Sequence, residues 1–237
     1  MKKVLCVILI ALCHTLAWAQ SGQQTMGSWC AIREGLRQTD PHKDSLGRKD
    51  ELYSRFHSQR LQTILGTTFA WNYKNLGVGG KFRGISYRDG TAVVATGGNW
   101  TAMTMGNFII GGKGLENDIS NKTYQHEYGH YIQSQSLGPY YVMLIAIPSI
   151  MSKVIYKGDH HFSPTEQDAN IRAYNYFSTY YPGEFIWDFE SNPILGMETG
   201  VYPVIAPTKF DRVIYTLNPI IGTLVGGVVH GARKNEK

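Results

Sequence analysis

Cysteine is scarce in this chain of 237 residues, which contains only Cys6, Cys13 and Cys30. The first two lie in an apolar segment at the amino terminus, so Cys30 is the single cysteine of the remaining sequence. One cysteine cannot form an intramolecular disulfide, and it excludes the cysteine-rich type of structural metal site with four ligands. The fold must therefore be held by its apolar core and by any metal that other side chains bind.

Strong charge of one sign is also lacking. Lys and Arg number 23 against 18 Asp and Glu, which gives a net charge of +5. The two lysines at positions 2 and 3 belong to the amino-terminal segment, and without them the net charge is +3. The other basic residues are scattered, with adjacent pairs only at Arg48-Lys49 and Arg233-Lys234. A basic groove for nucleic acid is therefore not expected.

The amino terminus has the features of a signal peptide over residues 1–19. Two lysines precede an apolar run from Val4 to Leu12, and Ala17-Trp18-Ala19 has the small-x-small form of a cleavage site. An uncleaved membrane anchor is the alternative, but a spanning helix needs about 20 mostly apolar residues and His14 interrupts this run. We expect export to the periplasm or the exterior, with a mature chain of residues 20–237.

The whole sequence is 43% apolar, which is enough for the mature chain to form one domain. We expect an α+β fold with a core over about residues 48–193. Residues 20–45 are polar and typical of loops, and residues 48–65 have the periodicity of an amphipathic helix that ends at Gly66. Residues 67–114 change to glycines, aromatics and β-branched residues, typical of a small, mainly antiparallel sheet. Strands are expected at residues 69–71, 84–87, 91–95 and 107–110, with a hairpin turn at Arg88-Asp89-Gly90.

The pentapeptide His126-Glu127-Tyr128-Gly129-His130 lies in a segment with the signals of a single helix. Ser120 or Asn121 can cap its start, residues 122–136 contain no proline, and Gly138-Pro139 supplies a stop. Gly129 is unusual, because glycine inside a helix costs about 1 kcal/mol relative to alanine. A close neighbour at that turn would explain it.

The two histidines are four positions apart, so both rings leave the same face of the helix and can bind one Zn²⁺. Glu127 then lies beside the ion, where it can accept a proton from a metal-activated water. A zinc hydrolase needs a third protein ligand. Glu166 is the best candidate, in the first turn of a second helix that begins at Pro164 or Thr165. Asn170, one turn further along, can accept the outer N–H of a ligand histidine.

The two segments together resemble the gluzincin metallopeptidases, in particular the group of CAAX prenyl endopeptidases. The resemblance implies His126, His130 and Glu166 as zinc ligands, Glu127 as the general base and Asn170 as the support of a histidine. The family usually has aspartate at the last position. Asp168 is the competing third ligand, but two positions along a helix are about 200° of rotation, so it cannot share an ion with Glu166. The family pattern favours Glu166.

A longer likeness covers roughly residues 100–193, through residues 125–135, 138–139, 147–149 and 166–170. In this region the chain is similar to bacterial secreted proteins and to domains that end some Rhs-repeat proteins. This likeness implies zincin chemistry without a known substrate.

Further roles follow from position along the chain. His160, together with His161, precedes the second helix and can donate a hydrogen bond to the oxyanion of a reacting carbonyl, as can Tyr202. Residues 108–110 are either an edge strand that an extended peptide joins or a plain core strand. Residues 140–151 are apolar but too short to span a bilayer, so they are expected to be buried. The apolar tail at residues 219–229 favours a core strand or hairpin over contact with a membrane surface.

The sequence therefore predicts an exported zinc-dependent peptidase that acts on a peptide or protein substrate. Two alternatives remain open at this point: a secreted zincin-like module that binds a partner without cutting it, and an effector toxin of the Rhs type. The sequence leaves the oligomeric state undefined.

Overall fold

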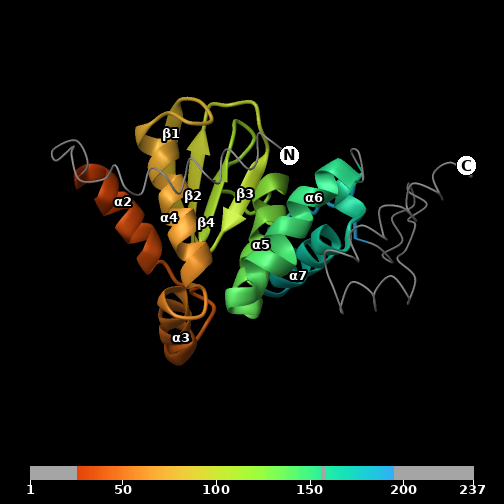
Figure 1. Cartoon of the computed structure of the whole chain (residues 1–237). Helices are drawn as coiled ribbons and strands as arrows, with labels where there is room; N and C mark the ends of the chain where they lie inside the picture. Colours follow the sequence, from red (N-terminus) through yellow and green to blue (C-terminus); the bar gives the residue numbers. More distant parts are fainter. Residues whose placement is uncertain (1–25, 156–158, 195–237) are drawn as a thin grey trace, which may run out of the picture. The chain divides into compact units, whose positions relative to one another are not determined.

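The computed structural model describes residues 26–155 and 159–194 (Figure 1). Over this range the chain is an α+β protein, as predicted, and it divides into two compact units between Asn117 and Asp118. The predicted signal peptide, Tyr202 and the apolar tail at residues 219–229 lie outside the described residues. Within that range, none of the helices combines the length and the apolar character that crossing a membrane requires.

The elements of the first unit are α2 (Met26–Arg37), α3 (Ser45–Phe56), α4 (Arg60–Asn75), β1 (Phe82–Arg88), β2 (Thr91–Thr96), β3 (Ala102–Met105) and β4 (Phe108–Gly111). Those of the second unit are α5 (Lys122–Leu137), η1 (Gly138–Tyr140), the π-helix η2 (Val142–Ala146), α6 (Ile147–Ile155), η3 (His160–Phe162) and α7 (Pro164–Tyr180).

The sheet has the strand order β1-β2-β4-β3 and is mixed. The two outer pairs are antiparallel, whereas β2 and β4 in the middle are parallel. Asp89 and Gly90 have φ values of +46° and +82° between the paired residues Arg88 and Thr91. Two successive positive φ values are typical of the two-residue turn that joins twisted antiparallel strands, so the predicted hairpin is confirmed.

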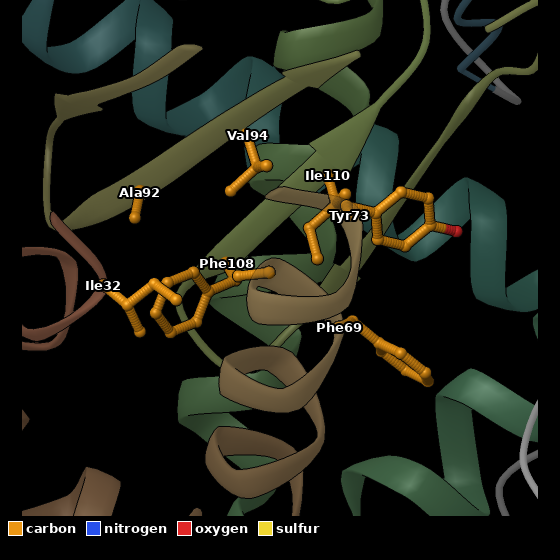
Figure 2. Packing of buried hydrophobic residues seen from close by; sticks show 8 residues of the cluster. Ile32, Phe69, Tyr73, Ala92, Val94, Phe108 and Ile110 are labelled. Atoms are coloured by element: carbon orange, nitrogen blue, oxygen red, sulfur yellow. The ribbon is translucent and has the colours of Figure 1, made fainter. Parts of the chain in front are cut away.

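Strand β4 is interior to the sheet, and all four of its residues are buried. Of the two alternatives for residues 108–110, the edge strand is therefore wrong and the core strand is confirmed. Phe108 and Ile110 join Ala92 and Val94 on one face of the sheet, as the alternation of side chains along a strand requires. That face packs against Phe69, Ala70 and Tyr73 of α4 and against Ile32 of α2 (Figure 2).

Four expectations for the first unit were wrong in whole or in part. The predicted helix at residues 48–65 is two helices, with a break between Phe56 and Arg60. Gly66 does not end a helix: it lies inside α4, where a Cβ would come within 2.2 Å of the Met105 carbonyl oxygen, so glycine lets this helix approach the sheet. Residues 69–71 are helical rather than extended, and part of the expected loop at residues 20–45 forms α2 and the start of α3. Phe69 and Ala70 pack in the core, so packing overrides the local strand preference of residues 69–71.

The two predicted helices of the second unit are confirmed. Asn121 caps α5 by accepting a hydrogen bond from the Tyr124 amide, and Gly138, with φ +53°, ends it. Helix α7 begins at Pro164, whose fixed φ suits the first helical position. The segment at residues 140–151 is only partly buried, because Tyr140 and Met143 are exposed while Ile145 and Ala146 are covered.

Candidate metal centre

Helices α5 and α7 lie side by side and cross at Gly129 (Figure 1). A Cβ at position 129 would lie 2.0 Å from the carbonyl oxygen of Ala169 and 2.5 Å from its carbonyl carbon. The expected close neighbour is therefore the backbone of α7, and only glycine permits this approach. The crossing brings together the functional side chains that flank it, His126 and His130 from α5 and Glu166 and Asn170 from α7.

His126, His130 and Glu166 converge on one point, with one ligand atom from each residue within 4.8 Å of the others. The Glu166 Oε2 atom lies 3.0 Å from His126 Nε2 and 3.4 Å from His130 Nε2. Two ligands about 2.0 to 2.1 Å from a tetrahedral Zn²⁺ are separated by about 3.3 Å. The two distances from Glu166 to the histidines are therefore close to those around a zinc ion. All three side chains are largely removed from solvent.

Asn170 fixes the orientation of the His126 ring. Its side-chain Nδ2 donates to the Pro193 carbonyl oxygen at 2.9 Å, which leaves its Oδ1 facing His126 Nδ1 at 2.7 Å. Because an amide oxygen only accepts, His126 must carry its proton on Nδ1. The Nε2 lone pair then faces Glu166. Asn170 is completely buried and is the support that its position predicted.

Gln133 fixes the His130 ring in the same way, and no role was predicted for this residue. Its Oε1 lies 2.8 Å from His130 Nδ1, while its Nε2 donates to the Thr165 carbonyl oxygen at 2.9 Å and to Asp168 Oδ2 at 2.8 Å. With two acceptors on the nitrogen side, the oxygen must accept from the histidine. Its position three residues after His130 on the same helix is the signal that the sequence contains.

With Nδ1 protonated in both rings, neutral imidazoles would aim their Nε2 lone pairs at an ionised carboxylate, an arrangement that needs positive charge between them. In addition, the buried Glu166 Oε1 atom has no hydrogen-bond partner. Without a metal, protons must supply the charge: burial alone would lower the pKa of His130, but the carboxylates of Glu166 and Glu127 raise it to about 9. Burial conversely raises the pKa of Glu166, and the two histidines hold it well below its usual range. One divalent cation between His126, His130 and Glu166 would supply the same positive charge.

Asp168 does not join this group. Its carboxylate accepts from Arg172 Nε at 2.6 Å and from Gln133, and its side chain is 41% exposed. Of the two candidates for third ligand, the structure places Glu166 next to the histidines and Asp168 outside them.

Glu127 follows His126 in α5 and is 5% exposed. Tyr141 is a neighbour that sequence reasoning missed. Burial raises the pKa of its phenol well above the usual value, and the carboxylates of Glu127 and Glu166 raise it further. The phenol therefore stays protonated and keeps its O–H as a hydrogen-bond donor. Nothing in its apolar sequence context distinguished Tyr141.

The two histidines before α7 differ in their ring contacts. The His161 ring lies edge-on to His126 with 6.3 Å between centroids, and the His160 ring is tilted against that of His161 with 3.9 Å between centroids. The buried Nδ1 atom of His161 has no hydrogen-bond partner. Burial lowers the pKa of His161 to about 4, with His160 and His126 adding to the effect, and burial also lowers the pKa of His160. Both rings are therefore neutral at pH 7.

No protein-family model, no curated protein and no solved structure matches this chain.

Proposed function

We propose that this protein is an exported zinc-dependent metallopeptidase of the gluzincin type, with a zincin-like arrangement of its two site helices. His126, His130 and Glu166 would hold the ion. The observation that carries this proposal is the convergence of three ligand atoms within 4.8 Å of one another, with the outer nitrogens of both rings hydrogen-bonded to buried amides.

When bound, zinc supplies a Lewis acid that polarises the scissile carbonyl and acidifies water in the site. Glu127 accepts the proton of the attacking water as the new C–O bond forms, and then delivers it to the amine as the C–N bond breaks. The predicted oxyanion donor was His160. Ring contact with His126 favours its neighbour His161 for this role, with Tyr141 as a further donor.

Replacement of the general base tests the proposal directly. Glu127→Gln should retain stoichiometric zinc, measured by atomic absorption, and should lower the cleavage of a diverse peptide library by at least about 100-fold. Glu184→Gln, at an exposed position of the same unit, is the matched control. Unchanged turnover in Glu127→Gln would remove the proposed base. Zinc binding by the unaltered chain without cleavage would favour the secreted binding module instead.

Export is tested separately. The amino terminus of the secreted protein, read by mass spectrometry, is expected near Gln20. Retention of residues 1–19 in the membrane fraction would instead identify an uncleaved anchor.

A further inference from the structure

The supports of the two histidines differ in charge. Asn170, which accepts from His126, donates its other hydrogen bond to a neutral group, the Pro193 carbonyl oxygen. Gln133, which accepts from His130, donates a hydrogen bond to a charged group, the Asp168 carboxylate. Both amides are completely buried, so each transmits its hydrogen bond without competition from solvent.

Asp168 is in turn held by Arg172 at the surface. The Arg172 Nε atom donates to Asp168 Oδ2 at 2.6 Å, and the side chains are 35% and 41% exposed. Arg172 also reaches Ser136 Oγ at 3.2 Å, so the pair spans α7 and α5. A continuous line of hydrogen bonds therefore connects the proposed metal ligand to an ion pair that solvent can reach.

We infer that Asp168 is a positioning residue for the metal centre, which it strengthens through Gln133. The carboxylate polarises the Gln133 amide, the amide oxygen accepts more strongly from His130 Nδ1–H, and His130 Nε2 becomes the better ligand. Arg172 weakens this polarisation, because its positive charge attracts electron density from the same carboxylate oxygen. The inference rests on the proposed metal site, and it assigns Asp168 a role other than the third ligand.

The directions in which two substitutions change the Zn²⁺ affinity distinguish this role from a structural one. Asp168→Asn should weaken Zn²⁺ binding by about tenfold, the lower end for residues behind a ligand. Arg172→Gln should tighten Zn²⁺ binding by about two- to threefold, because the opposing cation is removed. If the pair served only to hold the helices together, both changes would break the same contact and both would weaken binding.

Zn²⁺ affinity is measured on the whole mature protein by competition with a chelator of known affinity, and the unfolding temperature of the metal-free protein is measured beside it. Asp188→Asn is the control, because Asp188 has a similarly exposed side chain and pairs with Lys122. In the zinc-loaded protein, the ¹⁵N resonance of His130 Nδ1–H should move in Asp168→Asn and stay in place in Asp188→Asn. In a Gln133→Leu background, Asp168→Asn should have no further effect.

Three outcomes overturn the inference: Asp168→Asn behaves like Asp188→Asn, Arg172→Gln weakens binding as Asp168→Asn does, or the effect of Asp168→Asn persists in Gln133→Leu. Each of these leaves zinc binding by the unaltered protein intact, and with it the proposed function. Absence of zinc binding by the unaltered protein overturns both.

Discussion

Asn170 makes two hydrogen bonds that an aspartate at this position could not both make. An amide can donate to the Pro193 carbonyl and accept from His126 at the same time, whereas a carboxylate only accepts. The chain therefore exchanges a stronger contact with the histidine for a second bond that fixes the support itself.

We predict that Asn170→Asp does not restore a better site. The new carboxylate would face the Pro193 oxygen, now 2.9 Å from the amide nitrogen, and should lower the free energy of unfolding by about 1 to 3 kcal/mol. Asn170→Ala should instead weaken zinc binding by about 10- to 100-fold, because His126 loses its acceptor. Denaturant unfolding of the metal-free protein and zinc competition separate the two effects. Equal stability of Asn170→Asp and the unaltered chain would contradict this account.

At the residue scale, helical spacing and capping signals were sufficient to place His126, Glu127 and His130 near one another. Glu166, on a different helix, was predicted from the need for a third ligand and from the family resemblance. Gln133 and Tyr141 were not predictable in the same way. Their roles depend on contacts across α7 and through the buried interior, and a glutamine or tyrosine in such a segment is ordinarily read as packing. The relative order of His160 and His161 also required ring positions that a short turn does not determine.

At the scale of helices and strands, the site depends on the close approach of α5 and α7. Gly129→Ala adds a methyl group where the Ala169 backbone leaves no room, so the helices must separate. The gain in helix propensity is about 1 kcal/mol, but overpacking costs about 1 to 3 kcal/mol and the backbone cannot yield as a side chain can. We expect a net loss of stability of about 1 to 2 kcal/mol and weaker zinc binding.

Gly47→Ala in α3 is the control, because the nearest atoms to its Cβ belong to the side chains of Asp44 and Lys43. It should leave zinc binding unchanged. Both variants are compared by thermal unfolding and zinc competition. If Gly129→Ala bound zinc as tightly as Gly47→Ala, the ligands would not depend on this crossing.

Element boundaries were predictable where local chemistry sets them, as at Asn121, Gly138 and the Asp89-Gly90 turn. They were not predictable where a glycine serves a tertiary contact, because Gly66 looks the same in the sequence whether it ends a helix or lets the helix touch a sheet. The parallel pairing of β2 with β4 likewise followed from the path of the chain through β3, a strand that the sequence did not indicate.

At the scale of the whole molecule, each compact unit has its own stabilising centre. In the first unit Arg55 is 1% exposed, is paired with Glu51, and donates to the carbonyl oxygens of Leu36 at 2.8 Å and Gly90 at 3.0 Å. It thereby joins α2, α3 and the β1–β2 turn. In the second unit the proposed metal centre joins α5 and α7. We therefore expect the two units to open independently.

Two perturbations test this expectation together. Arg55→Met leaves Glu51 buried with Lys43 as its remaining cation and should cost about 3 kcal/mol, the lower end for a broken buried ion pair. Hydrogen exchange should then accelerate in α2, α3 and the β1–β2 hairpin. Removal of zinc with a chelator should accelerate exchange in α5 and α7, because ligand binding stabilises only the structure that holds it.

The crossed comparison decides the outcome. Arg55→Met should bind Zn²⁺ as tightly as the unaltered chain, and the chelator should leave the exchange of the buried β2 and β4 amides unchanged. Equal acceleration throughout the described residues in either experiment would mean that the chain opens as one cooperative unit. The metal would then stabilise the sheet as well as the two helices that carry its ligands.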